Sequence, residues 1–250
     1  MSSSNLSGIA ILGAGIFAKE GKYQFITTIL HLYDSYRCKT AHLAAIAALG
    51  SAAPPLKAVY SRSEKSSRNL AEAAAEILKL KTAPSVYHDE DASVNLDALL
   101  ARKDITIVTI ALPITVQPSI VLKSLAAGKH VLSEKPVAPD VKEGLEMIGT
   151  YHQLYKNKGQ VWRIAENYEA EPGYRAAGAA IRSGKIGKVI FFKTLGVVNM
   201  DKSSKWYKIP WRTVPDVSFS EYPYCASLIA MLYTVPRWIF GKLLSNLQLK

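Results

Sequence analysis

The sequence predicts an α/β fold with a doubly wound parallel sheet, because short apolar segments alternate with longer amphipathic ones along most of the chain. The first apolar segment, Gly8–Leu12, runs directly into a glycine-rich turn near the N-terminus. Another, Ile105–Ala111, has no charged residue and is typical of a strand buried on both faces. These observations favour a sheet whose two faces are both covered by helices.

Turn residues or glycines separate most of the expected elements. The expected strands are Gly8–Leu12, Leu56–Tyr60, Ser85–His88, Ile105–Ala111, His130–Ser133, Gln160–Ala165 and Val189–Val198. The expected helices after the second strand are Glu64–Leu80, Asn95–Ala101, Thr115–Ala127, Pro139–Tyr155 and Gly173–Arg182. Ligands of doubly wound sheets bind at the carboxyl ends of strands. A site is therefore expected in the turns after the first, second, fourth and fifth strands.

The composition argues against several classes of protein. The net charge is +11, but the basic residues are scattered and no helix-turn-helix or zinc-finger spacing occurs, so no nucleic-acid partner is expected. No segment of about 18 uncharged apolar residues predicts a membrane span. Cys38 and Cys225 lack metal-ligand spacing, and the N-terminus lacks a signal pattern. These features predict a cytoplasmic protein without a metal site.

The turn after the first strand has the pattern G-x-G-x-x-A of a dinucleotide-binding site. Gly13 permits the tight turn, and Gly15 lets a pyrophosphate approach the backbone. A helix beginning near Ile16 directs its free N–H groups at that anion, so Phe17 and Ala18 complete the expected cofactor-binding segment. The alternative is an ordinary strand–turn–helix unit of another α/β fold.

The turn after the second strand distinguishes NAD from NADP. NAD sites usually place Asp or Glu here for the ribose 2′-hydroxyl, whereas this chain has Ser61, Arg62 and Ser63. Two hydroxyls and a guanidinium suit a 2′-phosphate, which an acidic residue would repel. NADP is therefore expected rather than NAD. The alternative is a solvent-exposed helix N-terminus, at which Ser63 is only a cap.

The turns after the fourth and fifth strands form the expected nicotinamide side of the site. Pro113, which follows Leu112, ends a strand and turns the chain over this part of the crevice. Glu134 and Lys135 stand between a buried strand and Pro136, where a charged pair is costly to bury unless it has a function. Lys135 is the expected catalytic residue, with its ammonium binding a substrate hydroxyl whose hydrogen leaves as hydride. The alternative is a surface ion pair before a turn.

Four further blocks, together with the glycine-rich turn, resemble one protein family. They are residues 126–136, 165–175, 182–189 and 206–212. Together they resemble the glucose–fructose oxidoreductase and inositol dehydrogenase family, the second and fourth its fungal members in particular. The resemblance implies an N-terminal Rossmann domain and a C-terminal α/β domain with an open antiparallel sheet. It also implies that Lys135 contacts substrate and nicotinamide, that the peptide before Pro136 is cis, and that Asn167 lies near the cofactor.

The resemblance predicts the domain organisation. Residues 1–165 are expected to form the NAD(P)-binding Rossmann domain, and residues 166–216 the incomplete start of the substrate and oligomerisation domain. Residues 217–250 are an atypical tail. The family's segment with Asp and His beyond Asp216 is missing, and no histidine follows His152. The chain is therefore expected to be truncated and catalytically incomplete, and the family's homo-oligomer is doubtful for it.

Residues 21–40 are expected to be an insertion. A continuous helix from Ile16 to Leu49 would contain 34 residues and measure about 51 Å, which is too long for this architecture. Removal of the insertion leaves a helix of ordinary length with Leu43, Ile46 and Leu49 on an apolar face.

One hypothesis explains both the insertion and the tail. The residues Gly21-Lys-Tyr and Val217-Ser can be encoded by sequences that resemble donor splice sites, so both segments are interpreted as retained introns. The alternative is genuine lineage-specific insertion and divergence.

The expected function is that of an NADP-dependent oxidoreductase acting on a sugar, a polyol or a related hydroxyl or carbonyl compound. Its partner is then a small-molecule substrate. Two alternatives stay open. One is a non-catalytic dinucleotide-binding regulatory protein, and the other is the product of incorrect splicing.

Overall fold

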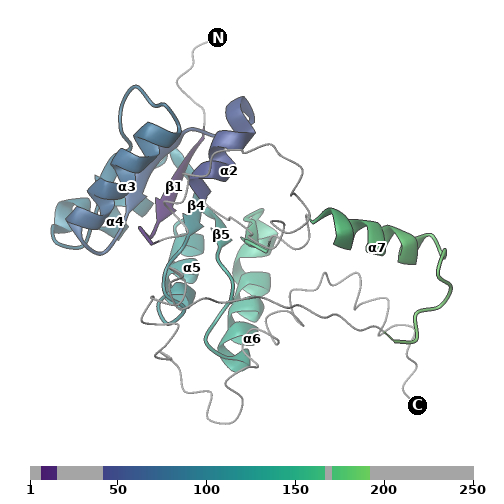
Figure 1. Cartoon of the computed structure of the whole chain (residues 1–250). Coiled ribbons are helices and arrows are strands. Elements are labelled where there is room, and N and C mark those ends of the chain that lie inside the picture. Colours follow the sequence, from purple (N-terminus) through teal and green to yellow (C-terminus); the bar gives the residue numbers. More distant parts are fainter. Residues whose placement is uncertain (1–6, 16–41, 167–170, 192–250) are drawn as a thin grey trace, which may run out of the picture. The chain divides into compact units, whose positions relative to one another are not determined.

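The computed structural model of the protein describes residues 7–15, 42–166 and 171–191. The chain divides between Ala165 and Glu166 into two units, which are described separately. The first unit is a sheet with helices packed against it (Figure 1). The described part of the second is helix α7, Pro172–Arg182, followed by turns and irregular backbone through Phe191.

The strands are parallel and follow the order β3-β2-β1-β4-β5-β6. Their bounds are β1 Gly8–Leu12, β2 Leu56–Tyr60, β3 Ser85–Tyr87, β4 Ile105–Ile110, β5 His130–Ser133 and β6 Trp162–Ile164. The chain starts in the middle of the sheet, runs to one edge, returns past β1 and runs to the other edge. This is the doubly wound order of the Rossmann fold, so the fold class predicted from the sequence is confirmed.

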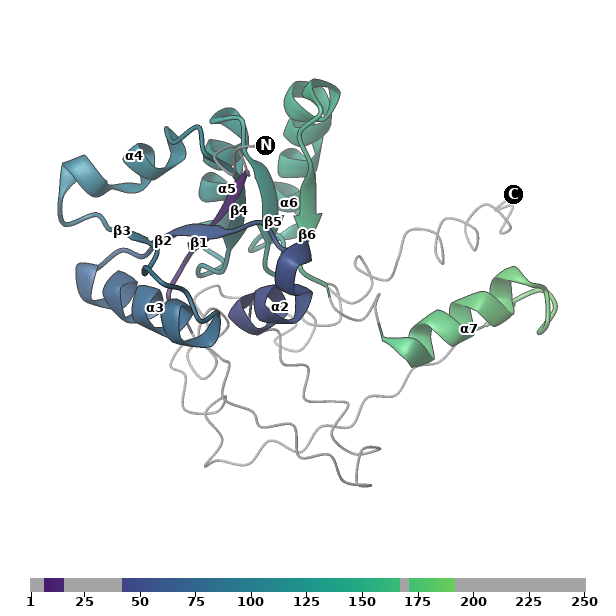
Figure 2. The same cartoon turned by 90° about the horizontal axis from the view of Figure 1, so that it is seen from above.

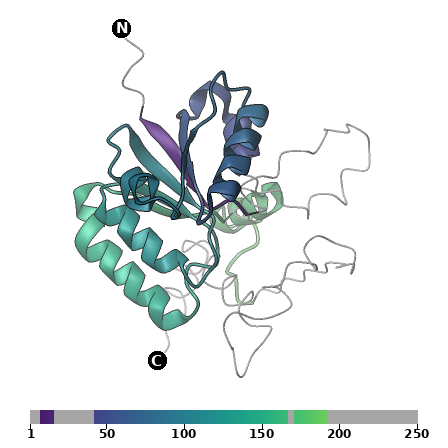
Figure 3. The same cartoon turned by 90° about the vertical axis from the view of Figure 1, so that its left-hand side faces the viewer.

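Helices cover both faces of this sheet. Those of one face are α2 His42–Leu49 and α3 Glu64–Ile77, and those of the other are α4 Leu96–Leu100, α5 Gln117–Ala126 and α6 Val141–Thr150. Short 3-10 turns lie at Gly50–Ala52, Ala92–Val94 and Lys156–Lys158. Figures 2 and 3 show the two layers from other sides, with the blue α3 and the teal α5 on opposite faces of the sheet.

The alternation of side chains along β1 divides the core in two. Ile9 and Ile11 face the layer of α2 and α3, where Leu43 and Leu70 are fully buried. Ala10 and Leu12 face the other layer, which is filled by α4, α5 and α6. Because every residue of β1 is buried, the strand is fixed from both faces, and the turn that follows it starts from a rigid position.

Several expected bounds are wrong, each for a local reason. The helix expected over Glu64–Leu80 ends at Ile77, because Lys79 adopts the left-handed conformation with a φ of 51°. The helix expected over Pro139–Tyr155 starts after Asp140, whose side chain accepts a hydrogen bond from the amide of Glu143. It then continues as one turn of π-helix over Tyr151–Tyr155.

Two other expectations are corrected in part. The apolar face expected on α2 includes the buried Leu43 and the packed Ile46, but Leu49 is 59% exposed. The strand expected over Val189–Val198 does not begin at Val189, since residues 189–191 are irregular and the remainder lies outside the described residues. The segments 21–40 and 217–250 also lie outside them. Within the described ranges, no helix has the length and apolar character needed to cross a membrane.

Candidate dinucleotide site at the carboxyl edge of the sheet

Backbone hydrogen bonds hold the turns after three central strands side by side. The amide of Gly13 donates to the carbonyl of Tyr60 at 2.7 Å, and that of Ala111 donates to Leu12 at 2.8 Å. The amide of Glu134 donates to Ile110 at 2.9 Å. These bonds extend the strand pairing past β1, β4 and β5, so the predicted site turns share one edge of the sheet. A dinucleotide in a doubly wound fold lies across this edge.

Gly13 is required by the packing of this edge. Its φ is 110°, and a β-carbon added to it would stand 2.2 Å from the carbonyl oxygen of Ala111. No other residue type fits a position with both constraints. A β-carbon on Gly15, by contrast, would have no described atom within 4 Å. Packing against the described residues therefore does not explain the second glycine, and among them there is room for a ligand close to its backbone.

The turn after β2 carries a cation and no carboxylate of its own. Arg62 is exposed, and no ion pair joins it to another residue in the described ranges. Ser63 is the N-cap of α3, where its hydroxyl oxygen accepts a bond of 3.3 Å from the amide of Ser66. The capping role that was the alternative for Ser63 is thus real. Ser61 and Arg62 remain the side chains available to a phosphate.

An acidic side chain does reach this turn, but from the neighbouring strand. Asp89, which follows β3, accepts a hydrogen bond of 2.7 Å from the hydroxyl of Tyr60. Its amide donates to the carbonyl of Arg62 at 3.2 Å. Burial of the phenol raises the pKa of Tyr60, and the hydrogen bond to Asp89 raises it further. The sequence alone did not predict this contact between the ends of β2 and β3.

The turn after β4 leads directly into α5. Leu112 packs partly against the core, and the carbonyl of Pro113 accepts bonds from the amides of Val116 and Gln117. Pro113 itself is exposed. The strand therefore ends where predicted to within one residue, and the proline lies beside the first turn of the helix.

The turn after β5 contains Glu134, Lys135 and a cis peptide bond before Pro136, as the family resemblance implied. Only one of the two charges is buried. Glu134 is 7% exposed and Lys135 is exposed, and the carboxylate contacts the Lys135 amide nitrogen at 3.3 Å. Among the described residues the ammonium is therefore exposed, and only the Glu134 carboxylate bears the cost of burial.

The buried carboxylate of Glu134 has a partner that sequence reasoning missed. Nε2 of His42, at the start of α2, lies 2.9 Å from Oε1 of Glu134, and both side chains are 9% exposed. The contact is an ion pair by distance, without the alignment of a hydrogen bond. It ties the Glu134–Lys135 turn to the helix that follows the glycine-rich segment. A buried carboxylate needs such a partner.

The contacts of Gln117 were also not predicted from the sequence, where the family resemblance places a histidine near this position. The side chain of Gln117 is 1% exposed, and its Nε2 donates to the carbonyls of Glu134 and Pro136, both at 2.8 Å. These two carbonyls flank Lys135 on either side. The remaining predicted residues, Ile16, Phe17, Ala18 and Asn167, lie outside the described residues.

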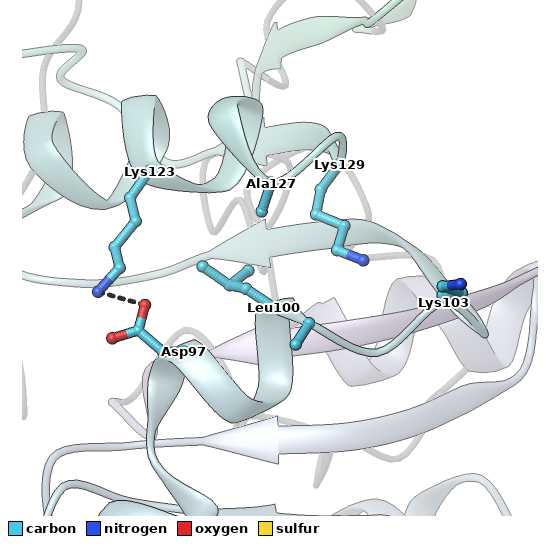
Figure 4. Close-up of a pocket in the computed structure, with 7 residues that line it drawn as sticks. Asp97, Leu100, Lys103, Lys123, Ala127 and Lys129 are labelled. Carbon is cyan, nitrogen blue, oxygen red and sulfur yellow. Dashed lines mark ion pairs between the residues drawn. The ribbon is translucent and has the colours of Figure 1, made fainter.

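A separate cavity of about 480 Å³ lies at the opposite, amino edge of the sheet (Figure 4). Lys123 pairs there with Asp97 at 2.7 Å. The ammonium of Lys129 is buried and donates to the carbonyls of Arg102 and Ile105, and burial lowers its pKa. These interactions join α4, α5 and the entry to β5, so both lysines have structural roles. Among the described residues, no cluster of three potential metal ligands occurs at either edge.

A doubly wound sheet with a glycine-rich turn after its first strand defines a dinucleotide-binding protein of the Rossmann class. Residues 8–161 match the profile of the oxidoreductase family with an NAD-binding Rossmann fold, Gfo/Idh/MocA. The chain belongs to this family, as the sequence resemblance predicted. An oxidoreductase family of this kind implies a small-molecule substrate.

Three relatives illustrate the match. A dehydrogenase of Fusarium mangiferae is 35% identical over 212 residues, which are 84% of this chain and 52% of that protein. Levoglucosan dehydrogenase of Pseudarthrobacter phenanthrenivorans is 30% identical over 104 residues, covering 42% of this chain and 26% of that one. The crystal structure of scyllo-inositol dehydrogenase from Lactobacillus casei superposes with a TM-score of 0.51 at 22% identity, over 74% of this chain and 44% of that one. The chain therefore spans about half the length, or less, of these relatives.

Proposed function

We propose that this chain is the cofactor-binding part of an NADP-dependent oxidoreductase acting on a sugar, a polyol or a related hydroxyl or carbonyl compound. The observation that carries the proposal is the arrangement of the carboxyl edge. It places a glycine-rich turn, an exposed Arg62 without an ion-pair partner in the described ranges, and an exposed Lys135 at successive turns of one Rossmann sheet. The sugar and inositol dehydrogenases among the relatives support the substrate class.

The residues present fit a dinucleotide. Gly13 brings the turn against Ala111, and among the described residues no atom would stand within 4 Å of a β-carbon on Gly15, which leaves space there for a pyrophosphate. The guanidinium of Arg62 would bind a 2′-phosphate through charge-assisted hydrogen bonds, with the hydroxyl of Ser61 beside it. Leu112 and Pro113 would border the nicotinamide side. When bound, the cofactor supplies or accepts the hydride.

Lys135 is proposed as the catalytic residue of this chain. Its ammonium would donate a hydrogen bond to the substrate oxygen and so hold the reacting carbon toward the cofactor. Glu134 is proposed to act through its position beneath the turn, because its carboxylate is buried against His42. The residues after Ala165, including Asn167, are proposed to begin the substrate-binding domain.

The reaction itself is proposed for the whole protein type, since the chain spans about half of its curated relatives or less. The substrate pocket of that type requires groups beyond those of the Rossmann unit. Cofactor binding is the part of the function that the described residues support directly. The cytoplasmic location expected from the sequence belongs to the same proposal.

Titration of the purified chain with NADPH and NADH tests the proposal. NADPH is expected to bind more tightly, and Arg62→Ala to lower its affinity by about tenfold to 150-fold with little effect on NADH. Arg68→Ala is the matched control, since Arg68 is an exposed arginine of the next helix turn that pairs with Glu64. Equal affinities for the two cofactors, or an unchanged ratio in Arg62→Ala, would contradict the NADP assignment.

A further inference from the structure

Lys135 is held through the backbone of its turn, while its side chain is exposed. Its own amide contacts the Glu134 carboxylate, and the carbonyls of its two neighbours, Glu134 and Pro136, accept hydrogen bonds from Gln117. The ammonium end of the residue is exposed. The turn after β5 has no regular secondary structure, yet hydrogen bonds hold its backbone on both sides of Lys135. Such bonds hold a functional side chain near its working geometry.

Gln117 is well suited to fix this turn. It stands at the start of α5, and the carbonyl of Pro113 accepts a hydrogen bond of 3.0 Å from its amide, so its backbone is anchored to the turn after β4. Its carboxamide then reaches the turn after β5 with both bonds at 2.8 Å. The side chain is 1% exposed, so water does not compete for these two bonds.

We propose that Gln117 is a positioning residue for Lys135, which it aligns toward the nicotinamide side of the bound cofactor. This inference rests on the proposed function. Under this proposal, Gln117 contacts neither the cofactor nor the substrate. It joins the two turns that border the nicotinamide side, so that Lys135 and the Leu112–Pro113 segment keep a constant separation.

The same chain offers a matched control. The side-chain amide of Gln160 donates to two backbone carbonyls, those of Leu125 and Lys129, at the amino edge of the sheet. Gln117→Met and Gln160→Met therefore each remove two side-chain bonds to backbone carbonyls, with the same change of side chain. Only the first substitution lies beside Lys135. A loss of stability alone is expected from both, whereas an effect on Lys135 is expected from one.

The first arm of the test needs no cofactor. Hydrogen exchange at the amide of Lys135 is expected to accelerate by about tenfold or more in Gln117→Met relative to Gln160→Met, under conditions where both variants are folded. Unchanged exchange would overturn the inference, because the turn would then be held without Gln117. Gln117→His, which keeps one N–H donor, is expected to fall between wild type and Gln117→Met and serves if the methionine variant does not fold.

The second arm measures NADPH binding and the protection of Lys135 from acetylation by bound NADPH. Gln117→Met is expected to reduce this protection by about tenfold at saturating NADPH, while Gln160→Met retains it. Full protection in Gln117→Met overturns the positioning role even if exchange has increased. Failure of the wild-type chain to bind NADPH or NADH overturns the proposed function, and with it the purpose of the contact. The two failures are thus distinguishable.

Discussion

The hydroxyl of Tyr60, at the end of β2, donates a hydrogen bond of 2.7 Å to the carboxylate of Asp89, beyond the end of β3. Tyr60 is buried and Asp89 is exposed, so the bond fixes an acidic group at the rim of the edge that carries Arg62. The phenol must stay protonated to donate. Burial disfavours the charged phenolate, and the hydrogen bond to the Asp89 carboxylate favours the protonated phenol, so both raise the pKa of Tyr60.

The raised pKa predicts how stability changes in alkaline solution. The unfolded tyrosine loses its proton near pH 10, as free tyrosine does, whereas the folded one keeps it to higher pH. The folded chain then binds more protons than the unfolded chain, so stability falls as the pH rises above about 10. Tyr60→Phe is expected to lessen this fall in urea unfolding measured from about pH 8 to pH 11. Asp89→Asn should lie between the two, and identical slopes in all three proteins would refute the coupling.

The two glycines of the first turn predict opposite effects of one substitution. Gly13→Ala places a β-carbon 2.2 Å from a backbone oxygen at a φ of 110°, and is expected to destabilise the fold by about 3 kcal/mol or more. Gly15→Ala meets no described atom within 4 Å and is expected to change stability by less than about 0.5 kcal/mol.

Cofactor affinity separates these variants further. The methyl group of Gly15→Ala would occupy the space left for the pyrophosphate, so NADPH binding is expected to weaken although the melting temperature is unchanged. Thermal unfolding and cofactor titration of both variants measure the two effects. A stable Gly15→Ala that binds NADPH as wild type would show that the open space is not part of the site.

The doubly wound fold class and most of the element centres followed from the sequence, because the patterns that indicate strands, helices and the glycine-rich turn are local. Ile105–Ile110 is uncharged throughout, and Gly13 has a conformation that glycine adopts readily. The π-helical turn at Tyr151–Tyr155 was not predictable, since its apolar spacing resembles that of an ordinary helix. The end of α3 depends on the left-handed backbone of Lys79, a residue type with no preference for that conformation.

Sequence analysis predicted only those site residues whose type is unusual within their own turn. Arg62 and Lys135 stand out in the sequence, whereas Gln117 stood out only as a departure from the histidine that relatives often have near this position, without any sign of its bonds. Its role depends on carbonyls that lie 17 and 19 positions further along the chain. In the same way, His42 at the start of α2 pairs with Glu134, which follows β5 and lies far along the chain. Pairing over such separations is created by the fold and has no local pattern.

The His42–Glu134 pair predicts a strong coupling between helix α2 and the Lys135 turn. Both side chains are 9% exposed, so His42→Ala leaves a buried carboxylate without its partner. The expected loss of stability is about 3 kcal/mol. In His42→Ala with Glu134→Gln, the charge is absent and the combined loss should be smaller than the sum of the two single losses by about 1–3 kcal/mol. Urea unfolding of the four proteins measures the coupling, and strict additivity would show that the two residues do not interact.

Deletion of residues 21–40 tests the expected insertion, which lies outside the described residues. Helix α2 begins at His42 and buries Leu43 in its first turn, so the chain after the segment is packed against the sheet. Without the insertion, the segment from Ile16 to Leu49 contains 14 residues and is expected to form a helix of about 21 Å, an ordinary length for a Rossmann helix. A shorter chain segment before α2 is also expected to lower the conformational entropy that folding must overcome. The deletion variant is therefore expected to melt at a higher temperature and to bind NADPH at least as tightly as the full chain. A lower melting temperature with weaker binding would show that the segment is an integrated part of the domain.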